Sequence, residues 1–319
     1  MKGKQAEGQS RGMSTASSHQ IVLVHGRGAK PKQEELITLW TQALRAGLKR
    51  DAPKQIKVFD QAEIHMVYYA DHLKDFVEEG FNEHLDLDNR RQDLEALAAK
   101  EKAKDFRRKF YEAQPGKTPL KEFAMDLSAS IGLGAPALRK VLPELQYYWD
   151  EDNPWPSSTR TELASLLQGL LAKNHNVLLL SHCLGSVVAW DSLWYLSHQL
   201  DQPTDTKRMA RWITFGSPLG ARAVQKKLAG QDQQGARRYP SVLNAWDNLS
   251  AEDDYICHDK SVADDYNPML EQRMIGDIRD HTIYNLSVRY GRSSPHSSTG
   301  YLIHPRMSAL IADWLKSKP

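Results

Sequence analysis

Short apolar runs alternate with helical patterns along most of the chain. The unbroken apolar run 177–180 is typical of a strand covered on both faces, and further strands are expected at 21–25, 64–70, 211–215, 242–246 and 282–288. Apolar residues spaced by three and four predict amphipathic helices, and four such patterns begin at Leu36, Leu163, Leu184 and Met307. This alternation predicts an α/β protein with a mostly parallel, doubly wound sheet.

The regular order of strands and helices stops between residues 80 and 155. Residues 88–111 are densely charged, and the more apolar piece 120–148 is interrupted by glycine and proline. Because the strand–helix order resumes unchanged afterwards, we expect 80–155 to be a helical cap or lid inserted over a pocket, with Ile131 and Leu133 in its lining. The alternative is that it packs against the sheet edge or a partner subunit.

The turn after the third predicted strand is the most informative feature of the chain. Its residues are Ser181, His182, Cys183, Leu184 and Gly185, and a helix follows at once. A turn that holds its central residue at a strained backbone angle needs small residues two positions away, and Ser181 and Gly185 meet this need. Such a turn directs the side chain of Cys183 out of the sheet, toward the start of the helix.

This turn resembles the nucleophile elbow of the α/β-hydrolase family, Gly-x-Ser-x-Gly, with cysteine in place of the serine. Four further segments resemble the lipase- and esterase-like branch of that family, in the family's order: 21–28, 212–220, 251–256 and 295–302. They resemble, respectively, the oxyanion loop, the turn after the elbow, the acid loop and the histidine loop. The resemblance covers most of the chain outside 1–19 and 80–155, and implies an α/β-hydrolase domain over 20–319.

The resemblance implies a role for each residue of a catalytic triad. Cys183 is the nucleophile, His296 relays the proton, and Asp254 orients the histidine. The backbone N–H groups of Arg27 and Leu184 form the oxyanion hole. A cysteine beside an imidazole and a helix start can form a thiolate–imidazolium pair, which attacks thioesters and activated acyl groups. The predicted function is hydrolysis of carboxylic ester or thioester bonds through an acyl-enzyme.

Some of these assignments have competitors in the sequence. His304 precedes Pro305 at the start of the last helix and competes with His296, although a capping role suits its position better. The alternatives to Asp254 as the triad acid are Asp253, Asp247 and Asp259.

Other polar residues have simpler explanations. His25 and His182 flank the predicted pocket and are expected to hold loops through hydrogen bonds. Arg27 is expected to contribute only its backbone to the site. The alternative is that its side chain binds an anionic group. Cys257 is expected to be inert. The basic residues between 100 and 109 are interspersed with acids and are typical of a solvated helix face.

Two other functions remain open. A cysteine at this elbow also resembles polyhydroxyalkanoate synthases, which would make the protein an acyltransferase, although the first elbow glycine of that pattern is replaced by Ser181. Alternatively, the chain is a binding protein that keeps the fold after losing the catalytic serine.

Composition favours one globular enzyme domain. The chain has 319 residues, of which 40% are hydrophobic and 26% charged, and the formal net charge of +2 argues against nucleic acid or an anionic membrane as partner. Two cysteines suit a reducing, cytoplasmic compartment.

Residues 1–19 have no apolar core and predict a disordered tail, and no apolar run approaches the ~18 residues of a membrane span. No dinucleotide loop, P-loop or zinc spacing is present, so a small acyl substrate and no cofactor or metal are expected.

Overall fold

The computed structural model describes residues 18–76, 83–100, 142–200, 208–252, 254–257, 260–289 and 295–317. Of the predicted tail 1–19, residues 1–17 lie outside this range, and the first strand begins at His19. Four residues named above also lie outside the described part of the chain: Ile131, Leu133, Asp253 and Asp259.

The described residues form a parallel β-sheet of six strands in the order β2-β1-β3-β4-β5-β6. The strands are β1 His19–Val24, β2 Glu63–Val67, β3 Asn176–His182, β4 Arg211–Phe215, β5 Ala245–Ala251 and β6 Asp277–Ile283. Every neighbouring pair is parallel, so the predicted α/β class with a mostly parallel sheet is confirmed.

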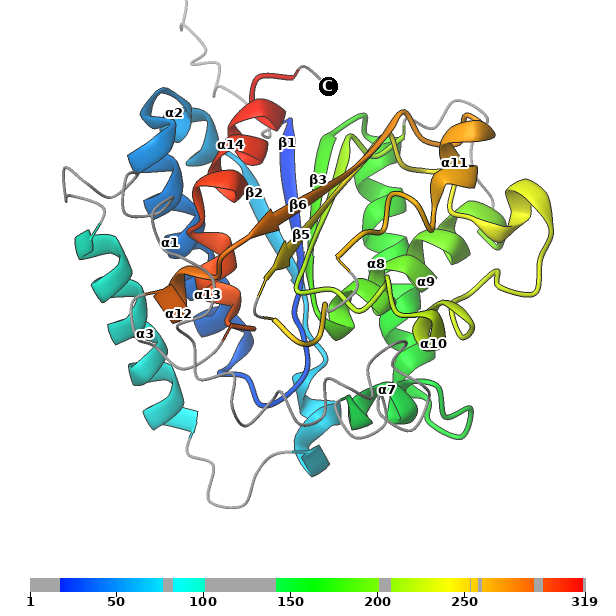
Figure 1. Cartoon of the computed structure of the whole chain (residues 1–319), viewed down its shortest axis with the longest axis horizontal. Helices are drawn as coiled ribbons and strands as arrows, with labels where there is room; N and C mark the ends of the chain where they lie inside the picture. Colours follow the sequence, from blue (N-terminus) through cyan, green and yellow to red (C-terminus); the bar gives the residue numbers. More distant parts are fainter. Residues whose placement is uncertain are drawn as a thin grey trace, which may run out of the picture.

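Helices cover both faces of the sheet (Figure 1). One face carries α1 Gln33–Asp51, α2 Ile56–Phe59, α3 Glu83–Lys100, α12 Leu286–Arg289, α13 Ser298–Leu302 and α14 Pro305–Trp314. The other face carries α7 Pro143–Tyr148, α8 Trp155–Ala172, α9 Leu184–His198, α10 Arg222–Gln225 and α11 Asn267–Glu271. Short 3-10 helices occupy Pro53–Gln55, Ala70–Phe76 and Gly235–Arg238.

Two apolar clusters, one on each face, explain the unbroken apolar runs. In β1, Val22 and Val24 join the cluster under α8 and α9, whereas Ile21 and Leu23 join the cluster under α1 and α14. Successive side chains of a strand point to opposite faces, so a strand covered on both sides must be apolar at every position. β3 lies at the centre and is buried along its whole length.

The last two strands differ from the sequence prediction. β5 begins at Ala245 rather than at 242, and β6 lies at Asp277–Ile283 rather than at 282–288, where Leu286–Arg289 forms the short helix α12 instead. β6 is an edge strand in which only Ile278 and Ile283 are buried, so an apolar run does not mark it.

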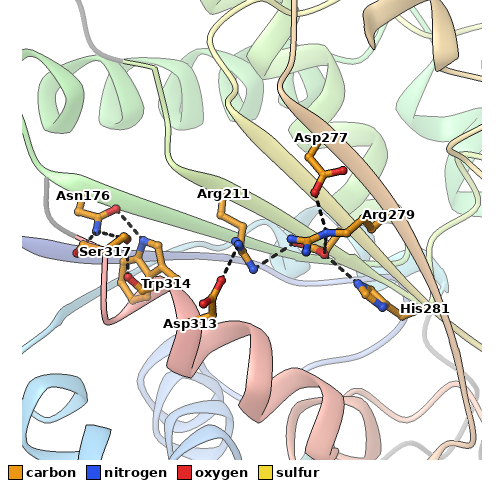
Figure 2. Close-up of polar contacts among 9 residues, drawn as sticks. Asn176, Arg211, Asp277, Arg279, His281, Asp313, Trp314 and Ser317 are labelled. Carbon is orange, nitrogen blue, oxygen red and sulfur yellow. Dashed lines mark hydrogen bonds and ion pairs between the residues drawn. The ribbon is translucent and has the colours of Figure 1, made fainter.

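A buried carboxylate accounts for part of the polar character of these two strands. Asp247 of β5 is fully buried, and its Oδ1 lies 2.8 Å from Nε2 of His281 and 3.1 Å from Nε of Arg279, both on β6. Its Oδ2 lies 3.4 Å from Nη1 of Arg211 on β4, which also pairs with Asp313 of α14 at 3.1 Å. Figure 2 shows Arg211, Arg279 and His281 in this cluster. The pairing of β4, β5 and β6 is therefore supported by charge as well as by backbone hydrogen bonds.

Removing this carboxylate should be costly. We expect Asp247→Ala to lower the free energy of unfolding by about 3–5 kcal/mol, because it leaves partly buried cations without their counter-charge. Asp277→Asn is the matched control, since Asp277 pairs with the same Arg279 at 2.9 Å but is 49% exposed. The control variant should lower the free energy of unfolding, measured by urea denaturation, by at most about 1 kcal/mol. Equal losses in the two variants would contradict this account.

Candidate active site

The predicted site residues gather at the carboxyl edge of the sheet. From β1 the chain passes to β2 on one side, and it then returns to β3 on the other side of β1. In open α/β sheets, ligands bind at the carboxyl ends of the strands where the order reverses in this way. The loop after β1 carries Gly26 and Arg27, and the residue after β3 is Cys183. Both are therefore at the position where this architecture builds its sites.

Cys183 occupies a strained turn between β3 and α9. Its φ is 53°, one of three positive values among the described non-glycine residues. A side chain at Gly185 would bring its Cβ within 2.3 Å of the His25 carbonyl oxygen, so only glycine allows α9 to start so close to β1. A Cβ at Gly26 would lie 2.8 Å from that of Cys183, which shows how closely the loop after β1 approaches the thiol. Leu184 begins α9, and the first N–H groups of a helix have no partner inside it.

His296 and Asp254 meet beside Cys183, although 42 positions of sequence separate them. Nδ1 of His296 lies 2.8 Å from Oδ2 of Asp254. Asp254 is 2% exposed, and its other oxygen, Oδ1, accepts a hydrogen bond of 3.0 Å from the backbone N–H of Ile256. An added Cβ at Gly216 would lie 3.0 Å from Cε1 of His296, so the turn after β4 packs directly on this pair.

Electrostatics favours the charged form of His296. Burial by itself lowers the pKa of this imidazole, but the charges of Asp254 and then Cys183 raise its pKa to about 10. Nε2, the ring nitrogen that does not contact Asp254, is buried, and the proximity of Cys183 contributes to the raised pKa of His296. The arrangement can hold an imidazolium between a thiolate and a carboxylate.

The other histidines have different surroundings. His25 is buried, hydrogen-bonds through Nδ1 to the Gly26 carbonyl and accepts from the Tyr69 N–H, and burial lowers its pKa to about 3. His182 contacts the His296 carbonyl oxygen through Nε2 at 3.1 Å, and burial lowers its pKa as well. His304 is the N-cap of α14 and accepts from the N–H of Arg306. His25 and His182 thus hold loops as neutral rings, and His304 caps a helix.

Two cations organise the loop after β1. Nε of Arg27 donates to Oε1 of Glu144 in α7 at 3.0 Å, and Glu144 is 1% exposed. Burial opposes the charge on Arg27, but the charges of Glu144, Cys183 and Tyr255 raise its pKa above the usual value. Nζ of Lys30 donates to the carbonyl oxygens of Arg27, Gly28 and Ala29. The side chain of Arg27 therefore links α7 to the loop beside the thiol, which the sequence did not predict.

The described parts of the segment 80–155 lie on opposite faces of the sheet. α3 contacts α1 and α12, and its Leu94 and Leu97 join the apolar cluster on that face. α7 lies at the end of the sheet toward which the strands run (Figure 1). Its Leu145 belongs to the same buried apolar cluster as Cys183. Of these two helices, α7 is the one that borders the candidate site.

A buried carboxylate fastens α7 to α9. Oδ2 of Asp191 in α9 accepts from the Tyr148 hydroxyl of α7 at 2.9 Å, and Oδ1 accepts from the Ala229 N–H at 2.7 Å. Burial raises the pKa of Asp191 to about 6, against the lowering effect of these two hydrogen bonds and of Arg160.

This raised pKa predicts the pH dependence of stability. Between about pH 6 and 4 the folded protein binds a proton on Asp191 that the unfolded chain does not, so this group makes the fold more stable as pH falls. Relative to the isosteric Asp191→Asn, which cannot titrate, the wild type should gain about 2 kcal/mol of unfolding free energy on going from pH 7 to pH 4. Urea denaturation across this range measures the difference, and Asp232→Asn, at an exposed carboxylate, is the control. Parallel pH profiles for the wild type and Asp191→Asn would refute the argument.

Two residues at the site were missed from sequence. Glu144 is a lone acid in the apolar stretch 142–149, and a charge in such a stretch is a usable signal for a buried ion pair. Tyr301 lies in α13, and its hydroxyl donates to Oδ2 of Asp254 at 2.7 Å. Its position five residues after His296 gave no signal, because the contact depends on how α13 folds back over β5. The structure places Asp247, an alternative acid, against Arg279 and His281 rather than against His296.

Comparison with protein-family models, with curated proteins and with solved structures finds no match for this chain. In the described part of the structure, no helix is long and apolar enough to cross a membrane. No group of three or more metal-binding side chains comes together among the described residues.

Proposed function

We propose that this protein is a hydrolase of carboxylic ester or thioester bonds, with an α/β-hydrolase fold and the triad Cys183, His296 and Asp254. The observation that carries the proposal is a cysteine at a positive-φ strand–helix turn, next to a histidine whose far nitrogen binds a buried carboxylate. This is the nucleophile–base–acid order that acyl-transfer catalysis requires.

The first half of the proposed reaction forms an acyl-enzyme, in which a thioester joins the acyl group to Cys183. The Cys183 thiolate attacks the acyl carbon, and the carbonyl oxygen takes up the negative charge. The backbone N–H groups of Leu184 and Arg27 stabilise this oxyanion, since one begins α9 and the other lies in the loop packed on Cys183. As the tetrahedral intermediate collapses, the His296 imidazolium gives its Nε2 proton to the leaving alkoxide or thiolate.

The second half consumes water. Neutral His296 takes a proton from a water molecule, which attacks the carbonyl carbon of the thioester and releases the carboxylic acid. The Cys183 thiolate leaves, and the imidazolium has been regenerated beside it. Asp254 keeps its negative charge throughout, since its task is to hold the Nδ1–H tautomer and to balance the imidazolium charge.

A cap over the site is part of the proposal. Within 80–155, the part around α7 is the one that covers the substrate in this proposal. Glu144 of α7 binds Arg27 next to the thiol, and Leu145 belongs to the same apolar cluster as Cys183. An apolar cover favours acyl chains over short polar groups, at about 0.8 kcal/mol for each buried methylene.

An activity screen tests the proposal directly. The turnover of p-nitrophenyl esters and acyl thioesters of graded chain length is measured for the wild type, Cys183→Ala and Cys257→Ala. Cys257→Ala is the matched control, at the other free, buried cysteine. We expect turnover in the wild type and in Cys257→Ala only. A second candidate function, a non-catalytic binding protein, is favoured by the complete burial of Cys183. Absence of turnover together with no iodoacetamide labelling of Cys183 would support that alternative.

A further inference from the structure

Tyr301 makes a close polar contact to the candidate triad from outside it. Its hydroxyl lies 2.7 Å from Oδ2 of Asp254, the same oxygen that faces His296. We propose that Tyr301 is a positioning residue for the proposed reaction, which acts by fixing the Asp254 carboxylate in the orientation that His296 requires. The inference rests on the proposed function and assigns a role to a residue outside the triad.

The hydrogen-bond pattern directs the hydroxyl proton of Tyr301 toward Asp254. The backbone N–H of Ala251 donates to the same hydroxyl oxygen at 2.9 Å, so that oxygen already accepts and its single hydrogen remains for the carboxylate. Tyr301 is fully buried, and its ring lies 5.8 Å from Phe215 and 6.3 Å from His182, centroid to centroid. Burial, followed by the Asp254 charge, raises the pKa of the phenol well above its usual value, so it remains a donor at any pH of activity.

Three hydrogen bonds together define how the carboxylate is turned. Oδ1 of Asp254 accepts from the Ile256 N–H, and Oδ2 accepts from Tyr301 and faces Nδ1 of His296. With the Tyr301 hydroxyl removed, Oδ2 loses one of its two partners and the carboxylate is free to rotate about its terminal torsion. His296 then spends less time with Nε2 directed at Cys183, and the chemical step slows while substrate binding is unaffected.

The matched pair of variants is Tyr301→Phe and Tyr266→Phe. Both remove one buried hydroxyl, and that of Tyr266 donates to the Leu219 carbonyl oxygen at 3.0 Å, away from the triad. We expect Tyr301→Phe to lower kcat on the best thioester substrate about 10- to 100-fold with KM unchanged, the range for a hydrogen bond to a charged group. The kcat and KM of Tyr266→Phe should both stay within about twofold of the wild-type values. Melting temperatures confirm that both variants are folded.

A double-mutant cycle with Asp254→Asn separates positioning from a general structural effect. If Tyr301 acts through the Asp254 carboxylate, Tyr301→Phe should cost almost nothing in the Asp254→Asn background, because the group it orients is already gone. Additive losses, or an unchanged kcat in Tyr301→Phe alone, would overturn the inference. The rate at which iodoacetamide alkylates Cys183, followed by mass spectrometry, provides the same cycle without a substrate.

Failure of this inference and failure of the proposed function give different results. If Cys183→Ala and Asp254→Asn both retain wild-type turnover, the triad itself is wrong. If those two variants lose activity and Tyr301→Phe does not, the triad holds and only the role of Tyr301 is refuted.

Discussion

Cys183→Ala is expected to abolish acyl turnover and to leave the fold intact. The substitution removes only the sulfur atom at the apex of the turn and keeps the Cβ that packs near Gly26. Loss of a triad nucleophile lowers kcat by about 10⁶-fold where the remaining groups cannot replace it. The measurement is steady-state turnover of the best ester or thioester found, with the melting temperature as the check on folding.

Serine at the same position should behave differently. We expect Cys183→Ser to keep or raise ester hydrolysis, because the turn, the histidine and the carboxylate are arranged as for a serine nucleophile. Ser181 and Ser186 do not substitute for it, since their hydroxyls face each other at 3.3 Å in the interior. Wild-type activity in Cys183→Ala would show that another residue attacks the substrate.

His296→Ala is expected to slow acylation by about 10²- to 10⁴-fold, the usual contribution of general acid–base catalysis. The variant cannot protonate the leaving group, and Asp254 loses the imidazolium that balances its charge. Single-turnover acylation of Cys183, followed by the release of the leaving group, isolates this step from product release. The rate of iodoacetamide labelling should fall as well, because the thiolate loses its cationic neighbour.

His304→Ala is the control for His296→Ala. His304 caps α14 through Nδ1, so its loss should cost about 1 kcal/mol of stability and change the acylation rate little. Equal losses of rate in the two variants, or a greater loss at His304, would overturn the choice of His296 as the base.

Much of the site was predictable because its residues follow strands. Cys183 and Arg27 follow apolar runs that could be recognised as strands without a structure. Because the carboxyl ends of parallel strands share one edge of the sheet, both residues were expected at that edge. The choice between Asp254 and its alternatives was not predictable in the same way. Asp247 lies in β5, where it binds the cations of β4 and β6, and only the position of the following turn brings Asp254 to His296.

The end of the sheet shows the limit of pattern recognition. Five of the seven residues of β6 are polar, and the strand lies at an edge of the sheet. Its pairing therefore depends on the carboxylate of Asp247 and on backbone hydrogen bonds rather than on an apolar run. Apolar periodicity carries no information about a strand that is stabilised in this way. The apolar residues near 286 suggested a strand and in fact form the short helix α12.

The sequence by itself determined the α/β class, the strands buried on both faces and the turn that presents Cys183, because each depends on neighbours along the chain. Tertiary structure decided which acid and which histidine meet, that Glu144 holds Arg27, and that Tyr301 binds the oxygen of Asp254 that faces His296. These contacts join residues between 42 and 117 positions apart. Such pairs arise only from the way helices pack across the sheet, and local sequence patterns do not encode that packing.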